Sequence, residues 1–204
     1  MTYFVSGIGT EIGKTIASAI LTEALEADYW KPIQAGDLDH SDTDKVKALV
    51  SNSISQFHQE SYRLTTPMSP HAAAQKEGLS IEIENMKQPN TTNPLIIEGA
   101  GGLLVPLNEQ DCIIDLIEQL KVQVILVSQH YLGSINHTLL SIEALKKRHI
   151  PIKGILFNGT KNHETEHIIL SKTKIPFLGR IPVLSKLNKQ TIKKVALEIK
   201  KNME

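Results

Sequence analysis

Residues 7–15, with the sequence GIGTEIGKT, combine glycines, a lysine and a hydroxyl residue in an order that suits phosphate binding. Backbone N–H groups of a glycine-rich loop can converge on one anion. Lys14 would then reach the β- and γ-phosphates of a nucleotide, and the Thr15 hydroxyl would bind Mg²⁺. The loop is a variant, because Ile8 stands where the standard pattern has its first glycine.

The flanking segments decide between phosphate binding and an ordinary helix start with a solvated lysine. Residues 2–6 form a β-branched and aromatic run that predicts a buried strand, and residues 16–25 carry apolar residues at helical spacing without Gly or Pro. A strand, a glycine loop and a helix direct the free N–H groups of the helix N-terminus at one anion. This context favours phosphate binding.

Further charged residues follow at predicted strand ends and in a loop. Residues 28–33 predict a short strand that Pro32 stops, with Lys31 at its C-terminal end. Ligands of open parallel sheets bind at that edge, although a solvated lysine fits the position equally well. The loop at 37–44 holds four aspartates before a helix predicted at 45–50. Aspartates there commonly cap the helix, and one of them could also bind Mg²⁺.

A second acidic position follows an apolar strand. Residues 95–98 predict a buried strand that ends in Glu98, and the sequence Gly-Ala-Gly-Gly comes directly after it. A carboxylate at a strand end beside a phosphate loop is typical of a residue that faces Mg²⁺. An edge glutamate without a chemical role is the alternative.

The elements that must position these residues are strands and helices in alternation. Further strands are predicted at 122–128, 152–158 and 177–181, and further helices at 71–76, 135–147 and 189–201. Apolar strands separated by helices pair in parallel and are covered on both faces. The sequence therefore predicts an α/β fold of the P-loop NTPase class, with a mostly parallel twisted sheet, helices on both faces and a single domain over residues 1–204.

Charge and cysteine content narrow the function. The 22 Lys and Arg residues balance the 22 Asp and Glu residues, so no net charge favours nucleic acid or an anionic membrane. Cys112 is the only cysteine, which excludes an internal disulfide and a multi-cysteine metal site. No apolar run approaches the ~18 to 20 residues of a membrane span. We expect a cytoplasmic protein that binds neither nucleic acid nor membrane.

The ordered set of motifs resembles the dethiobiotin synthetase family over almost the whole chain. The motifs are GIGTEIGKT at 7–15, KPIQAG at 31–36, Ser-Asp at 41–42, EGAGG at 98–102, LGSINH at 132–137 and GRIP at 179–182. The longer phosphate loop is also that family's own form. The resemblance implies a homodimeric ligase (cyclo-ligase) of biotin biosynthesis that uses ATP and Mg²⁺. It would close 7,8-diaminopelargonate and CO₂ into dethiobiotin through a phosphorylated carbamate, releasing ADP and phosphate.

The resemblance also implies a role for each matched position. Lys14 and Lys31 would be catalytic, and Thr15, Asp42 and Glu98 would surround Mg²⁺. The ATP site would comprise Thr10, Glu11, Ile12, Gly13, Lys14, Thr15, Asp42, Glu98, Gly99, Ala100, Gly101, Asn158, Gly159, Pro182, Val183 and Leu184, with Asn158 reading the adenine edge. The substrate would lie near Ala35 at a dimer interface. Its carboxylate would be bound by the partner's Gly133, the partner's Ser134 and the partner's Asn136, the serine acting as a helix cap.

Two positions depart from the family pattern, and two other functions compete. Ala35 replaces an expected hydroxyl residue, and Lys189 replaces an acidic residue expected near the nucleotide. A partitioning or nucleotide-switch ATPase typically carries an extra lysine early in its loop, and residues 6–12 contain none. A nucleoside or metabolite kinase needs an arginine-rich lid, whereas the chain has only Arg63, Arg148 and Arg180.

Overall fold

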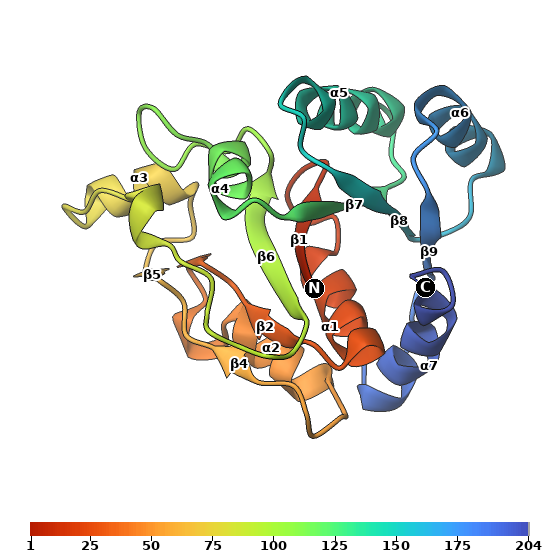
Figure 1. The fold of residues 1–204 in the computed structure, drawn as a ribbon, viewed down its shortest axis with the longest axis horizontal. Coiled ribbons are helices and arrows are strands. Elements are labelled where there is room, and N and C mark those ends of the chain that lie inside the picture. Colours follow the sequence, from red (N-terminus) through yellow and green to blue (C-terminus); the bar gives the residue numbers. More distant parts are fainter. Residues whose placement is uncertain (204) are drawn as a thin grey trace.

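The computed structural model, which describes residues 1–203, is built on a seven-stranded parallel sheet (Figure 1). The strand order is β4-β2-β6-β1-β7-β8-β9. The bounds are Thr2–Gly7 for β1, Asp28–Trp30 for β2, Phe57–His58 for β4, Leu95–Gly102 for β6, Gln123–Gln129 for β7, Ile152–Asn158 for β8 and Phe177–Ile181 for β9. Because β1 lies between β6 and β7, the loop after β1 emerges near the middle of the sheet's carboxyl edge.

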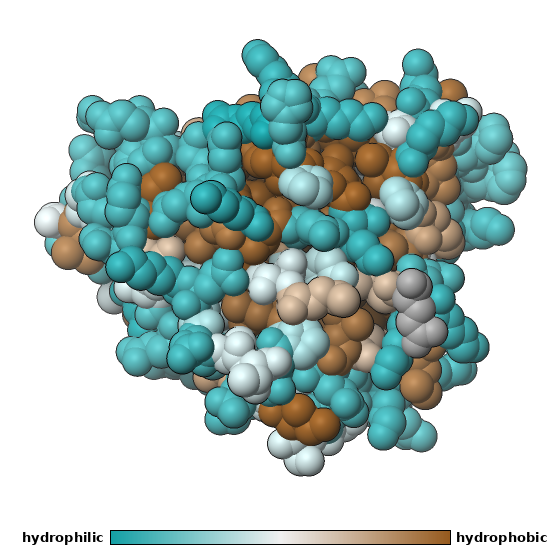
Figure 2. Space-filling view, viewed as in Figure 1, coloured by the Kyte–Doolittle hydropathy of each residue, from teal (hydrophilic) through white to brown (hydrophobic). Residues whose placement is uncertain are grey.

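Helices cover both faces of this sheet, as the sequence predicts (Figure 1). One face carries α1 (Lys14–Leu25), α2 (Asp42–Leu49) and α7 (Lys189–Lys200), and the opposite face carries α4 (Ile113–Leu120), α5 (Ser134–Lys147) and α6 (His163–Thr173). In the space-filling view, polar side chains dominate the rim and apolar residues show between the helices (Figure 2). The predicted α/β fold class is confirmed.

Alternating side chains of the strands fill two cores. Phe4, Ile97 and Val124 point to the face that carries α4 and α5, whereas Val5 and Ile96 point to the face that carries α1, and all are fully buried. Strands buried on both faces read as continuous apolar runs, which is why the sequence signal for them is strong. None of the helices within residues 1–203 is long and apolar enough to cross a bilayer.

The strand predicted at 28–33 is wrong in its extent. Strand β2 ends at Trp30, and Ile33–Ala35 forms a separate strand, β3, which pairs in parallel with β5 (Tyr62–Leu64). Pro32 has no N–H to donate to a sheet ladder, and its carbonyl instead accepts the N–H groups of Ser61 and Tyr62 at 2.9 and 3.0 Å. Lys31 therefore lies at the break between two sheets.

Several helix boundaries also differ from the sequence prediction. Helix α2 begins at Asp42, three residues before the predicted start, and α3 spans Pro70–Lys76. Helices α4 and α6 carry no prediction of their own, and short 3-10 helices span Leu38–His40 and Ile83–Asn85. The early start of α2 matters most, because it places Asp42 in the first helical turn.

Candidate active site

The phosphate-binding loop connects β1 to α1 and is held by a residue from β8. Gly13 is the N-cap of α1 with a φ of 88°, a conformation that L side chains rarely adopt. A Cβ on Gly13 would lie 2.3 Å from Asn158 Nδ2. That amide nitrogen donates a hydrogen bond of 2.9 Å to the Ile12 carbonyl. Glycine is thus required at position 13 both by backbone conformation and by the close approach of Asn158.

Lys14, the first residue of α1, folds its side chain back over the loop. Its ammonium donates to the Gly9 carbonyl at 3.0 Å, and the residue is 8% exposed. Burial lowers its pKa to about 8, with a further lowering from the charge of Lys31, while Glu98 and Asp42 act in the opposite direction. An anionic group in the loop would compensate this unfavourable burial of charge.

Glu98 is the point at which the elements of the site meet. Its Oε1 accepts hydrogen bonds from Thr15 Oγ1 at 2.9 Å and from Lys31 Nζ at 3.1 Å. Its Oε2 accepts a hydrogen bond of 2.9 Å from the Tyr29 hydroxyl. The Glu98 side chain is fully buried, so these bonds supply the partners that its two oxygens cannot obtain from water.

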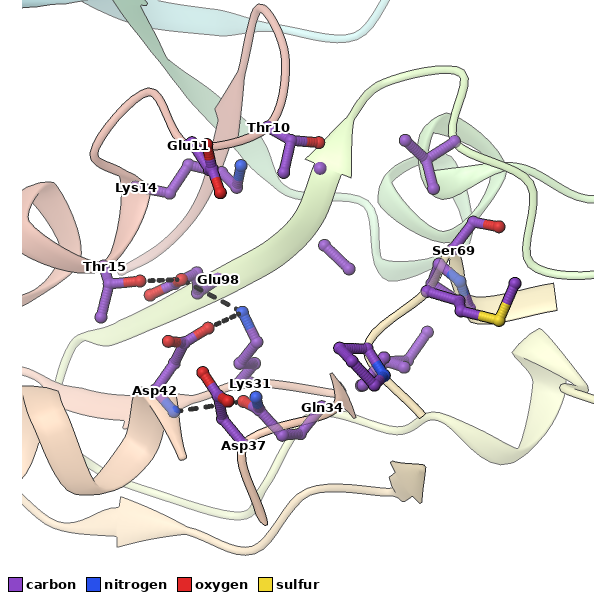
Figure 3. A pocket seen from close by; sticks show the side chains of 18 of the residues that line it. Thr10, Glu11, Lys14, Thr15, Lys31, Gln34, Asp37, Asp42, Ser69 and Glu98 are labelled. Atoms are coloured by element: carbon purple, nitrogen blue, oxygen red, sulfur yellow. Dashed lines mark hydrogen bonds and ion pairs between the residues drawn. The ribbon is translucent and has the colours of Figure 1, made fainter. Parts of the chain in front are cut away.

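Lys31 joins two acidic residues of the site, Asp42 and Glu98 (Figure 3). Its ammonium lies 2.7 Å from Asp42 Oδ2 and 3.1 Å from Glu98 Oε1. Burial by itself would lower the pKa of Lys31, but the two carboxylates outweigh it and raise the pKa above its usual value. Burial would likewise raise the pKa of Asp42, yet Lys31 and Lys45 hold it below its usual value. The site therefore holds a charged lysine beside the charged carboxylate of Asp42, with Glu98 as its second partner.

Asp42 is free to face the site because neighbouring residues cap α2. Ser41 is the N-cap, and Asp44 completes a capping box, with the Ser41 N–H donating to Asp44 Oδ2 at 2.9 Å. The backbone N–H of Asp42 donates to Gln34 Oε1 at 3.2 Å. The capping alternative for Asp42 is therefore wrong, since its side chain bonds the two lysines.

These groups line a cavity of about 740 Å³, a volume within the range of ligand pockets. Charged and hydroxyl groups from the loop, the segment after β2, α2 and β6 lie on one side (Figure 3). Ala35 is among the residues that line the cavity. The apolar lining comprises Ile33, Ala35, Pro67, Met68, Pro70, Ala100 and Val105. The remaining lining residues are Thr10, Glu11, Gly13, Lys14, Thr15, Lys31, Gln34, Asp37, Asp42, Ser69, Glu98 and Gly101. The cavity therefore joins an anion-binding end to an apolar wall.

The donor set of Thr15, Asp42 and Glu98 fits Mg²⁺. A hydroxyl and two carboxylates are hard oxygen ligands, and Mg²⁺ binds through one or two carboxylates together with phosphate oxygens. Thr15 and Glu98 are already within hydrogen-bond distance of each other at 2.9 Å, and Lys31 connects Glu98 to Asp42. The structure thus brings the three predicted ligands to one place beside the loop.

Other predicted site residues lie outside this cavity. Asn158 is the last residue of β8 and Gly159 follows it, and the Gly159 N–H donates to the Ile181 carbonyl at 2.8 Å. Residues 182 and 183 are exposed just after β9, and Leu184 is half-buried. Asn158 borders the loop, and one N–H of its side-chain amide donates to the Ile12 carbonyl. Contact of these residues with adenine stays a prediction.

The residues predicted to bind a substrate carboxylate lie at the start of α5. Gly133 is the N-cap, so the serine cap predicted there is wrong, and Ser134 is instead the buried first residue of the helix. Gly133 and Asn136 are exposed. None of the three lines the cavity of its own chain within the described residues. Their action on the site of a second subunit stays a prediction.

Two contacts of the site were missed by the sequence interpretation. Tyr29 bonds Glu98, and Gln34 bonds the N-terminus of α2, although the sequence places neither beside its partner. Gln34 belongs to the KPIQAG motif, which gave some signal. Tyr29 is adjacent to Trp30 in an ordinary buried strand, and nothing in the neighbouring sequence indicates that it contacts the site.

Known proteins with similar sequences or structures also bear on the family of this chain. A family model described as an AAA domain matches residues 1–191. The septum site-determining protein MinD complexed with Mg-ADP from Pyrococcus horikoshii is similar in structure, with a TM-score of 0.56 and 15% identity over 96% of this chain and 95% of that one. At that identity the likeness concerns the fold alone.

Two relatives are much more similar in sequence. The ATP-dependent dethiobiotin synthetase BioD of Christiangramia forsetii is 54% identical over 201 residues, which cover 98% of this chain and 97% of the relative. The protein of the same name from Cytophaga hutchinsonii is 49% identical over 198 residues, covering 97% and 96%. Together with the AAA-domain match and the phosphate-binding site, these relatives show that the chain belongs to the ATP-dependent dethiobiotin synthetase family.

Proposed function

We propose that this chain is a ligase that closes 7,8-diaminopelargonate and CO₂ into dethiobiotin, with conversion of ATP to ADP and phosphate. The observation that carries the proposal is the cavity itself, in which Lys14, Lys31 and the glycine loop face the same space as an apolar wall. The charged end suits phosphate and carbamate groups, and the wall suits the hydrocarbon chain of a diamino fatty acid. Membership of the family supports the same substrates.

The reaction requires positioning and charge neutralisation from the protein. One substrate amine adds to CO₂ and loses a proton, which gives a carbamate. The γ-phosphoryl group is then transferred to a carbamate oxygen with release of ADP. The second amine attacks the carbonyl carbon of this mixed anhydride, the C–O bond to phosphate breaks, and the ring closes. No side-chain nucleophile takes part, so lysines and backbone N–H groups suffice.

Each charged residue then has a defined task. Lys14 neutralises the β- and γ-phosphates from within the loop, and Lys31 neutralises the carbamate and the phosphoryl group in transfer. Residues 10–15 bind the phosphates through their backbone. Thr15, Asp42 and Glu98 would hold Mg²⁺, which supplies further charge neutralisation at the phosphates. The Mg-ADP complex of the structurally similar MinD supports the pairing of this fold with a metal nucleotide.

Further parts of the proposal concern the nucleotide base and the second subunit. Asn158, Gly159 and the segment 182–184 border the loop side of the sheet edge, and we assign the adenine to them. We assign the substrate carboxylate to the partner's Gly133, the partner's Ser134 and the partner's Asn136 in a homodimer. Free N–H groups at the start of a helix suit a carboxylate. A cytoplasmic location is proposed as well, and cell fractionation would test it.

The competing function is that of a partitioning or nucleotide-switch ATPase, because MinD shares the fold. Residues 6–12 lack the extra lysine typical of that class, and the sequence relatives are synthetases. The two functions differ in what ATP turnover requires. We expect ADP formation to depend on both the diamine and bicarbonate, measured in a coupled assay. Turnover that proceeds at the same rate without either one would support the switch ATPase.

A further inference from the structure

Two buried tyrosines flank the same residue of β6, and their hydroxyls point to different partners. Tyr3 on β1 and Tyr29 on β2 both pair with Ile96, one from each side. The Tyr29 hydroxyl donates to Glu98 Oε2 at 2.9 Å, whereas the Tyr3 hydroxyl donates to Met1 Sδ at 3.1 Å. Only Tyr29 therefore contacts the active site.

The register explains how Tyr29 reaches Glu98. Residues 96 and 98 of a strand point to the same face of the sheet, which here is the face covered by α1. Tyr29 lies opposite Ile96, so Glu98 is its diagonal cross-strand neighbour, a distance that long aromatic side chains span. The ring itself packs near Phe57, with centroids 6.3 Å apart. Packing fixes the position of the ring, and the hydroxyl donates its hydrogen bond to Glu98.

The two oxygens of Glu98 have separate tasks. Oε1 accepts from Thr15 and Lys31, which face the cavity, and Oε2 accepts from Tyr29, which is fully buried. A carboxylate with one oxygen tied on the buried side cannot rotate freely about its last side-chain bond. We propose that Tyr29 is a positioning residue that holds Glu98 so that Oε1 faces the metal nucleotide. This inference rests on the proposed role of Glu98 as a Mg²⁺ ligand.

The experiment compares Tyr29→Phe with the matched control Tyr3→Phe. Each change removes the hydroxyl of a buried tyrosine and keeps the ring, on the same face of the sheet and beside the same Ile96. The affinity for ADP is measured by calorimetric titration at a series of Mg²⁺ concentrations, in the absence of turnover. The quantity compared is the Mg²⁺ concentration at which the increase in ADP affinity is half complete. Loss of a residue that orients a metal ligand typically weakens metal affinity by about tenfold or more. We expect that shift for Tyr29→Phe and a shift below about twofold for Tyr3→Phe.

A purely structural role gives a different pattern. Both variants would then lower the melting temperature of the metal-free protein, and neither would change the Mg²⁺ requirement. An unchanged requirement in Tyr29→Phe overturns the proposal. A requirement that rises equally in Tyr3→Phe also overturns it, because the effect would not depend on the bond to Glu98.

Glu98→Gln separates this proposal from the metal assignment on which it rests. If Glu98→Gln raises the Mg²⁺ requirement and Tyr29→Phe does not, Glu98 is a ligand but Tyr29 does not position it. If Glu98→Gln has no effect, the metal assignment itself is wrong and the inference fails with it. In the double variant, Tyr29→Phe should add little to the shift of Glu98→Gln, because coupled residues are not additive. Additive shifts would contradict the positioning role.

Discussion

Lys31 Nζ lies 2.7 Å from Asp42 Oδ2, in a pair that joins the break between two sheets to the first turn of α2. The same ammonium contacts Glu98 Oε1 at 3.1 Å. One cation from the segment after β2 thus neutralises carboxylates from α2 and β6. The break at Pro32 makes this possible, because it takes Lys31 out of the sheet ladder and leaves its side chain at the carboxyl edge.

Replacing Lys31 by methionine should abolish turnover and destabilise the fold. Removal of one partner from a buried ion pair leaves unpaired charge, at a cost of about 3 to 5 kcal/mol. Lys45→Met is the matched control, because Lys45 contacts Asp42 at 3.2 Å from a more exposed position. Its loss should cost less than about 1 kcal/mol. Urea unfolding measures both, and equal destabilisation of the two variants would contradict the central position of Lys31.

Asp42→Asn should raise the Mg²⁺ concentration needed for activity, and it should destabilise the fold less than Lys31→Met does, because Lys31 keeps its bond to Glu98. Asp44→Ala should leave the Mg²⁺ requirement unchanged. It removes the acceptor that completes the capping box, at a cost of about 1 kcal/mol. Activity titrated against Mg²⁺ and thermal unfolding together check the pair. The assignment of Asp42 fails if the two variants exchange these patterns.

Asp28, at the opposite end of β2, should make stability depend on acidic pH. Burial would raise the pKa of its carboxyl, but hydrogen bonds from Asn93, Gln56 and His58 outweigh that effect and lower the pKa. The resulting stabilisation is fully present above the unfolded pKa of about 3.9 and is lost as the pH falls through the lower folded value.

Asp28→Asn tests this pH dependence. The variant should be less stable than the native chain at pH 7, by about 1 to 3 kcal/mol for hydrogen bonds to a charged group. The difference should shrink only below about pH 4. Asp39→Asn, at an exposed aspartate, serves as the control and should show no such difference. If the difference in stability between Asp28→Asn and the native chain stays the same from pH 5 to pH 3, the charge of Asp28 is not its cause.

Asn136→Ala should weaken diaminopelargonate binding by about 1 to 3 kcal/mol, the cost of a lost hydrogen bond to a carboxylate. The affinity for ATP should be unchanged. If the site is shared between subunits, mixing this variant with Lys14→Ala should restore activity. Each heterodimer would contain one site with an intact loop and an intact α5. Subunit exchange must be shown separately with labelled chains. A mixture that exchanges subunits and is no more active than its components rules out the shared site.

The fold was largely predictable because the strands that build it are continuous apolar runs. Residues 152–158 and 177–181 were predicted with the bounds that the structure gives them. Helix α6 carries no strong apolar stripe, since only Glu166, Ile169 and Thr173 are buried, and its pattern gave little signal. Helix α4 has only eight residues, but its buried residues Ile113, Ile114, Leu116, Ile117 and Leu120 follow helical spacing, so the sequence contained a signal that the interpretation missed.

The site was predictable where chemistry follows local order and unpredictable where it depends on tertiary contact. The sequence GKT after a strand indicates the loop by itself. The bond of Glu98 to Tyr29 joins residues 69 positions apart, and no local pattern encodes the register that brings them together. The contact of Asn158 with Ile12 spans 146 positions. Such contacts require the strand order, which the sequence pattern alone does not specify.

The proposed ring closure is tested most directly by following carbon from bicarbonate into the product. Purified protein is incubated with ATP, Mg²⁺, diaminopelargonate and ¹³C-bicarbonate, and the product is analysed by mass spectrometry. We expect dethiobiotin with one labelled ureido carbon and one ADP for each ring closed, and much slower product formation in Lys14→Ala. Removal of Lys14 from its place at the phosphates should lower the rate by roughly 10² to 10³. ATP hydrolysis by the folded native protein without labelled dethiobiotin would contradict the account.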